Sequence, residues 1–203
     1  DGISWNNSAR CSAKNSFIMN HDDVFTSQRP NCKDNLTENI VVWSNGGGNI
    51  FGPGGSEDIG GNNVYRNIYI VRGKNNFLTH HWSNGPKNIG GYLFENIYAD
   101  SRVPFSSFIY FNQITNQGTR FYTLRNVYAP FAPSTVDANN CYFVFDNVVL
   151  GGNKMSSVSQ MQINDKGAGN TYSFNGNGNG LVNGAVYELM PLCASGKRLD
   201  VTG

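Results

Sequence analysis

One short unit, an Asn followed by an alternating apolar strand, recurs through the 203-residue chain and constrains its fold more than any other feature. The unit begins at Asn15, Asn39, Asn67, Asn96, Asn126 and Asn147. Successive asparagines are 24, 28, 29, 30 and 21 residues apart. Self-similarity with a period of about 20 to 50 residues is typical of architectures in which structural repeats stack on one another.

Each repeat is too short for a strand–helix–strand crossover and is rich in β-branched and aromatic residues. We therefore predict an all-β, right-handed parallel β-helix, a solenoid whose coils stack about 4.8 Å apart. The chain has 30 Asn and 24 Gly residues, and Asn suits a coil corner because it tolerates left-handed backbone angles and can pair its amide with an Asn one coil away. A β-sandwich is the competing fold, although its turns should recur about every 8–12 residues.

The repeat divides the chain into three predicted regions. Residues 1–150 form the β-helix, and residues 151–184 hold final strands at 160–163 and 171–174 and a Gly/Asn-rich linker. Residues 185–203 begin a further module. The chain looks like an internal fragment of a longer protein. Because solenoid ends need capping coils, we expect this segment either to expose an open strand edge or to depend on the missing N- and C-terminal parts of the same protein as partners.

Charge and hydropathy exclude several classes of function. A net charge of +1 with 14% charged residues gives no electrostatic footprint for nucleic acid or anionic lipid. No run of about 18 apolar residues is present to span a membrane. The Gly-rich segments 46–48 and 52–55 lack the Gly-Lys-Ser/Thr of a phosphate loop, so we expect a long loop that rims a cleft or bulges from a coil. We predict neither a metal nor a cofactor.

The four cysteines favour a secreted protein with disulfides, since they form an even set without the spacing of a zinc or redox site. They are Cys11, Cys32, Cys141 and Cys193. Cys11 and Cys32 are 21 residues apart, close to one coil, so we predict a bridge between them. The alternative is two reduced thiols acting as small hydrophobic side chains.

Three carboxylates form the candidate catalytic site. Asp1 and the pair Asp22-Asp23 are about one coil apart, so they should lie on neighbouring coils. Clustered carboxylates repel when ionised, which raises the pKa of at least one and places a proton donor beside a base, as cleavage of a glycosidic bond requires. The alternative is that Asp1-Gly2 is a turn dipeptide and Asp22-Asp23 a solvated corner.

Aromatic residues and one histidine are the candidate substrate-binding residues, because the apolar face of a sugar ring packs well on an indole. They are Trp5, His21, Trp43 and Trp82. We expect Trp5 and Trp82 to be exposed, whereas Trp43 lies in a strand where burial and substrate contact are equally plausible. His80-His81 lacks a carboxylate or Cys at metal-binding spacing and is interpreted as structural.

The chain resembles glycoside hydrolase family 49, the dextranase and isopullulanase family, over roughly residues 1–150. The resemblance rests on residues 1–17, 21–24, 40–43 and 63–71. The resemblance implies endo-hydrolysis of an α-glucan such as dextran with inversion. It also implies that Asp22 is the general acid and that Asp1 and Asp23 position and activate water. Thr26 stands where the family leads us to expect Lys, which leaves the linkage open.

The related polygalacturonases of family 28 share the Asp-Gly and Asp-Asp spacing but add a Gly-His-Gly and an Arg-x-Lys segment. Neither is present, since residues 43–47 read Trp-Ser-Asn-Gly-Gly and residues 120–122 read Arg-Phe-Tyr. A neutral glucan therefore fits better than pectin.

Residues 185–189 and 196–201 resemble the opening strands of a ricin-type β-trefoil lectin repeat, which implies an appended carbohydrate-binding module. The sequence thus predicts a secreted polysaccharide hydrolase whose partner is its polysaccharide substrate, with no nucleic acid and no membrane involved. The alternative is a non-catalytic β-helix that binds carbohydrate or serves a structural matrix.

Overall fold

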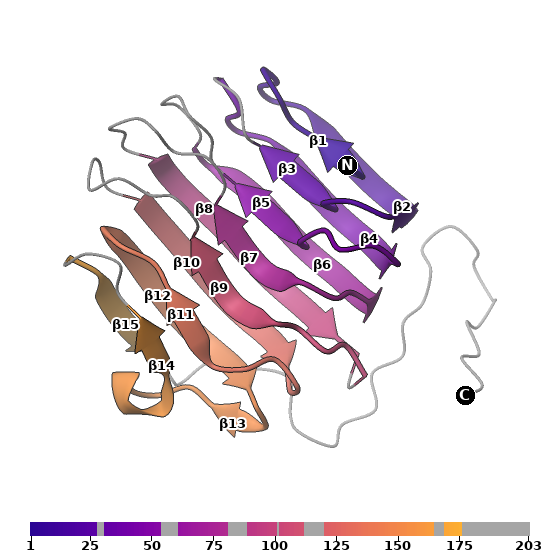
Figure 1. The fold of residues 1–203 in the computed structure, drawn as a ribbon. Helices are drawn as coiled ribbons and strands as arrows, with labels where there is room; N and C mark the ends of the chain where they lie inside the picture. Colours follow the sequence, from indigo (N-terminus) through magenta and orange to yellow (C-terminus); the bar gives the residue numbers. More distant parts are fainter. Residues whose placement is uncertain are drawn as a thin grey trace.

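The computed structural model describes residues 1–27, 31–53, 61–80, 89–100, 102–111, 120–164 and 169–175. These residues form a parallel β-solenoid whose coils follow one another along the stack from the indigo to the orange end in Figure 1. The predicted all-β parallel solenoid is therefore confirmed. Within the described ranges the one helix is the single 3₁₀ turn η1 (Val158–Gln160), and no helix is long and apolar enough to cross a membrane.

Two sheets form the walls of the solenoid. One sheet has short strands, in the spatial order β1 (Ile3–Ser4), β3 (Phe25–Ser27), β5 (Phe51–Pro53), β7 (Asn76–His80), β9 (Ser107–Phe111), β11 (Thr135–Asp137) and β14 (Gln162–Asn164). The other has long strands, in the order β2 (Ser12–Asn20), β4 (Leu36–Ser44), β6 (Asn63–Arg72), β8 (Ile89–Ala99), β10 (Arg120–Ala129) and β12 (Cys141–Leu150). β12 also pairs with β13 (Asn153–Lys154), which is antiparallel, and with β15 (Thr171–Asn175), which is parallel.

The asparagine repeat is the corner of each coil. All six asparagines are left-handed, with φ between 52° and 58°. Each side-chain amide nitrogen from Asn39 onward donates to the Oδ1 of the preceding asparagine at 2.9–3.0 Å. The predicted corner role and amide pairing are therefore confirmed, and the Asn spacings match the strand registers from Ser12↔Leu36 to Arg120↔Cys141.

A left-handed corner also changes which side chains face inward. In a regular strand, residues three apart point to opposite faces. Tyr65 and Ile68 flank Asn67 and are both buried, while Asn67 itself is exposed. One residue thus bends each long strand around the core without ending it, and aromatic rings stack between coils inside, as in Tyr65 with Phe94 at 5.4 Å and 6°.

Coil stacking continues past Leu150, the predicted end of the β-helix. β14 pairs with β11 and β15 pairs with β12, which adds strands to both sheets as far as Asn175. These strands overlap the two stretches predicted at 160–163 and 171–174. Residues 176–203, which include most of the predicted linker, Cys193 and the lectin-like tail, lie outside the described residues.

At the other end of the stack, β1 and β2 each pair on one side only within the described chain. Phe17 and Met19 on β2 are exposed by 60% and 62%. Within the described residues, β1 and β2 are thus the edge strands of the two sheets.

The predicted Cys11–Cys32 disulfide is wrong, since neither cysteine forms a disulfide bond. The coil at this point advances by 24 residues, so Cys11 is aligned with Asn35, whose Oδ1 accepts from the Cys11 backbone nitrogen at 3.0 Å. Cys32 lies three residues earlier in that coil and points inward, where its thiol donates to the Trp5 carbonyl at 2.7 Å. The alternative of a buried thiol holds for Cys32, whereas Cys11 is exposed.

Candidate active site

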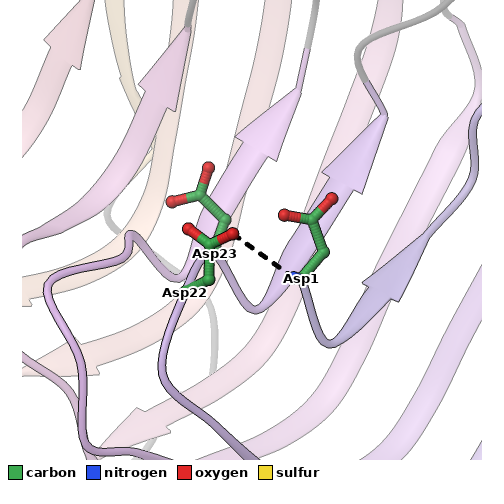
Figure 2. A group of neighbouring side chains, drawn as sticks. All are labelled: Asp1, Asp22 and Asp23. Atoms are coloured by element: carbon green, nitrogen blue, oxygen red, sulfur yellow. Dashed lines mark hydrogen bonds and ion pairs between the residues drawn. The ribbon is translucent and has the colours of Figure 1, made fainter.

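The structure brings Asp1, Asp22 and Asp23 together (Figure 2). Asp1 lies two residues before β1, and Asp22 and Asp23 lie in the turn from β2 to β3. The β1–β3 register, Ile3↔Phe25, is a step of 22 residues and therefore aligns Asp1 with Asp23. One carboxylate oxygen from each residue lies within 4.8 Å of those from the other two.

Asp22 is the most accessible member of this carboxylate cluster. Its side chain is 71% exposed, and its Oδ2 lies 3.4 Å from the amino nitrogen of Asp1, the contact dashed in Figure 2. The turn that presents it is held from behind by Asn20, whose Nδ2 donates to the carbonyls of Asp22 and Asp23 at 2.5 and 2.9 Å. A ligand could therefore reach Asp22 without a change in the turn.

Asp23 is largely buried and belongs to a second ladder. Its Oδ1 accepts from the backbone nitrogen and the Nδ2 of Asn49, at 2.6 and 2.8 Å. The Oδ1 of Asn49 accepts in turn from the Nδ2 of Asn76 at 2.8 Å. A carboxylate thus takes the place of an amide at the first position of a buried ladder, which fixes its direction.

Asp1 is positioned by Thr26, the residue found where the family resemblance leads us to expect lysine. The Thr26 hydroxyl, which is fully buried, lies 3.0 Å from Asp1 Oδ2 and 2.8 Å from Ser4 Oγ. Thr26 therefore supplies a neutral hydrogen-bonding group to the cluster, so no cation contributes at this position.

The glycines at 46–48 support the carboxylate turn from the next coil. A Cβ on Gly46 would lie 1.5 Å from the His21 carbonyl oxygen, and one on Gly48 would lie 2.0 Å from the Asp22 carbonyl carbon. Side chains cannot fit there. A Cβ on Gly47 would meet nothing within 4 Å. Gly46 and Gly48 are thus packed against the turn, and Gly54 and Gly55 of the predicted loop lie outside the described residues.

The structure describes three of the four predicted substrate-binding residues, Trp5, His21 and Trp43. Trp5 was expected to be exposed, and that is wrong: only 9% of it is exposed, and its Nε1 donates to the buried Thr37 hydroxyl at 3.0 Å. It faces the core because β1 turns this side of the chain inward. His21 is exposed beside Asp22. Trp82 and His81 lie outside the described residues, as does the side chain of His80.

Trp43 is half-buried on the outer face of β4. Its Nε1 donates to Asn45 Oδ1 at 3.0 Å, and the Arg72 guanidinium carbon lies 5.9 Å from its ring centroid. Trp43 is thus partly buried against the protein and partly exposed to solvent, so the structure does not choose between the two roles that the sequence allowed.

A row of outward-facing tyrosines was not identified from the sequence. Tyr69, Tyr98 and Tyr128 stack from coil to coil with centroids 5.1 and 5.2 Å apart. Burial raises the pKa of Tyr69 to about 12, and its hydroxyl donates to Asp100 at 3.3 Å. The signal was present, because Tyr occupies the second position after the corner Asn in three successive repeats.

The carboxylate cluster has the chemistry of a general acid and base. Its closest oxygens, within 4.8 Å, approach more nearly than the about 6.5–9.5 Å that separates the two carboxyl groups of inverting glycosidases. Three carboxylate oxygens at this spacing could also ligate a divalent cation, which prefers oxygen donors. The geometry thus supports a site that concentrates negative charge at an accessible corner.

Comparison of this sequence with known proteins does not assign it to a family. No protein-family profile, no curated protein and no solved structure matches this sequence. The resemblances to family 49 and to ricin-type lectins therefore remain hypotheses based on the residues quoted above, and what the structure establishes is that the chain is a parallel β-solenoid.

Proposed function

We propose that this protein is a secreted glycoside hydrolase that cleaves a neutral polysaccharide, an α-glucan such as dextran, at the carboxylate cluster. The observation that carries the proposal is the convergence of Asp1, Asp22 and Asp23 from two neighbouring coils. Within the described residues no other group of three His, Cys, Asp or Glu side chains lies this close together. Like charges brought together at a fixed corner cost stability, and such local costs tend to occur at functional sites.

The proposed roles follow from exposure and hydrogen bonding. Asp22, which solvent reaches, donates its proton to the glycosidic oxygen as the bond to the anomeric carbon breaks. Asp1 and Asp23, held by Thr26 and Asn49, orient a water and remove its proton as its oxygen attacks that carbon. Proton exchange with solvent restores the starting protonation state.

A neutral substrate is favoured by the side chains of the two described turns around the cluster, which include no Lys or Arg. Residues 21–27 and 45–53 contain no Lys or Arg that could bind the carboxylate of a uronate sugar. Arg72, on β6, lies over the ring of Trp43 on the neighbouring strand β4. The carboxylate oxygens lie closer together than is usual for inverting enzymes, so their spacing supports acid–base chemistry but does not select inversion. The anomer that is released, identified by NMR, decides between an inverting and a retaining reaction.

The second candidate function is a non-catalytic β-solenoid that binds carbohydrate. Asp23 favours it, because its hydrogen bonds to Asn49 begin a buried ladder and give this carboxylate a structural role without catalysis. The two candidates differ in whether Asp22 is needed for turnover.

The test is reducing-sugar release from dextran, pullulan and α-1,3-glucan. We expect Asp22→Asn to lower the rate by at least about 100-fold, since a general acid contributes about 10²–10⁴-fold. Asp34→Asn is the matched control, because Asp34 is also an exposed corner aspartate, is left-handed at φ 57°, and accepts one hydrogen bond from Asn62. It should retain full activity.

Equal activity in Asp22→Asn and wild type would remove Asp22 from the acid role. Wild type that binds these glucans without cleaving them would support the non-catalytic candidate. Assays with and without EDTA separate acid–base catalysis, which the chelator should leave unchanged, from chemistry at a cation held by the cluster.

A further inference from the structure

An open surface hollow of about 820 Å³ lies several coils away from the carboxylate cluster. Its walls come from the turns that lead from β8 to β9 and from β10 to β11, together with Gly151 and Gly152 after β12. The cluster lies in the equivalent turn from β2 to β3, three to four coils earlier. At about 4.8 Å per coil, the two sites are roughly 14–19 Å apart along the solenoid axis.

We propose that this hollow is a second carbohydrate-binding site, which holds a neutral sugar ring of a polysaccharide lying along the solenoid. The choice of polysaccharide rests in part on the proposed function, whereas the hollow and its chemistry do not depend on Asp22. The same polymer could reach both sites, because they occupy one row of turns.

Phe131 is the principal contact residue. Its side chain is 63% exposed. It lies between Pro130 and Pro133 in a turn closed by a hydrogen bond from the Ala132 nitrogen to the Ala129 carbonyl at 3.0 Å. Two prolines and this hydrogen bond restrict the turn, so the ring is presented with little conformational freedom to lose on binding.

Tyr128 and Phe105 form the other aromatic walls. Tyr128 is the last ring of the outer tyrosine row, since its register partner on the next coil is Val149 and not an aromatic residue. Phe105 is buried and packs edge-on against Phe77, with centroids 5.8 Å apart at 88°. The hollow thus combines an exposed ring with rings anchored in the solenoid.

Two glycines keep one side of the hollow open. Gly151 and Gly152 have φ of 54° and 76°, a conformation that L side chains rarely adopt. A Cβ on Gly152 would meet nothing within 4 Å, and one on Gly151 would meet only the Ala132 carbonyl oxygen at 3.8 Å. The space beside Phe131 is therefore unfilled because the backbone geometry excludes side chains there.

The chemistry of the walls selects the ligand. No charged residue is among those that line the hollow, and the hydroxyl-bearing residues among them are Ser106 and Tyr128. Its volume is within the about 300–1,000 Å³ of small-ligand sites. Aromatic and proline surfaces with a few hydroxyls fit a sugar ring, which has an apolar face and a hydroxyl-bearing edge.

The test measures affinity for soluble dextran and pullulan by retardation in polysaccharide-containing native gels. We expect Phe131→Ala to weaken binding by about 2- to 12-fold, the effect of losing one aromatic contact of about 0.5–1.5 kcal/mol. Phe121→Ala is the matched control, because Phe121 is 45% exposed but stacks on Tyr142 at 4.9 Å, away from the hollow. It should bind as wild type does.

Four outcomes overturn the proposal: no retardation of wild type by either glucan, unchanged binding by Phe131→Ala, an equal loss in Phe121→Ala, or loss of a wild-type dimer in Phe131→Ala with binding unaffected. The last would make the hollow a contact between two copies. Unfolding midpoints of both variants confirm that they are folded. Asp22→Asn distinguishes the two proposals, since this variant should bind the glucans as wild type does. If Asp22→Asn keeps full activity while Phe131→Ala loses binding, the proposed catalytic role of the cluster is wrong and the proposed binding site at the hollow is retained.

Discussion

At the scale of the residue, asparagine combines two properties that this solenoid needs at the same position. It accepts a left-handed backbone that most residues avoid, and its amide both donates to the preceding coil and accepts from the following one. Asn96 shows both, with contacts of 3.0 Å to Asn67 and 2.9 Å to Asn126.

Replacing Asn96 separates these two contributions. We expect Asn96→Ala to lower the free energy of unfolding by about 3–4 kcal/mol, from two hydrogen bonds of about 1 kcal/mol each and about 1–2 kcal/mol of left-handed strain. Asn96→Gly loses the same hydrogen bonds but tolerates the backbone, so its loss should be smaller. Urea unfolding measures both, and equal losses would show that the backbone conformation contributes nothing.

The glycines beneath the carboxylate turn provide a second prediction. Gly48→Ala places a Cβ 2.0 Å from the Asp22 backbone, whereas Gly47→Ala places one in open space. We expect Gly48→Ala to lower the free energy of unfolding by about 1–3 kcal/mol or more, because the turn must move, and Gly47→Ala to stay within about 0.5 kcal/mol. Thermal unfolding of the pair checks this, and glucan hydrolysis should fall only in Gly48→Ala. Identical behaviour would mean that the turn is not packed as described.

At the scale of the element, a row of alternating charges crosses the long strands beside the corner asparagines. The residues aligned by register are Lys14, Glu38, Arg66, Glu95, Arg125 and Asp146. Ion pairs join Lys14 to Glu38 at 3.3 Å, Arg66 to Glu38 at 2.6 Å, and Arg125 to Glu95 and Asp146 at 3.2 and 3.0 Å. A strand shifted by one coil would meet like charge, so the row favours the native register.

Glu38 makes this row sensitive to pH. The hydrogen bond from Arg66, assisted by Lys14, holds the pKa of Glu38 below its ordinary 4.5. A lowered pKa in the folded state means that the unfolded chain binds the proton more readily, so this stabilisation is complete above about pH 4.5 and is lost as the pH falls through the lower folded pKa.

We therefore expect Glu38→Gln to lose less stability than wild type when the pH falls from about 6 to about 3, as measured by urea unfolding at each pH. Salt near 1 M should narrow the difference, because the pairs are partly exposed and are screened. Parallel pH profiles for the two proteins would contradict the assignment.

At the scale of the whole molecule, the way coils stack decides which groups are accessible. Cys32 and Cys141 are fully buried, and Cys11 lies on the outside of its coil. In a Cys193→Ser background, we expect one thiol to react rapidly with a thiol reagent in the folded protein and the other two to react only on unfolding. Cys11→Ser should abolish the rapid reaction. If the mass of the native protein were lower by two hydrogens than that of the fully reduced chain, a disulfide would be present and this assignment of three thiols would be wrong.

The sequence by itself determined the coil. The Asn period, the alternating apolar strands and the turn residues are local features, and they predicted the all-β solenoid, its corners and the amide pairing. The proximity of Asp1 to Asp22 and Asp23 also followed from a separation close to one coil, because stacking at about 4.8 Å converts such a spacing into contact.

Only the tertiary structure decided which way side chains point. Each coil has its own length, so a 21-residue spacing aligns neither Cys11 with Cys32 nor Asp1 with Asp22. The left-handed corner also changes which residues of a strand point inward. Trp5 and Cys32 face the core, and Asp23 starts a ladder with Asn49, for the same reason. Direction in a solenoid depends on the neighbouring coils, and those contacts are not encoded by any one repeat.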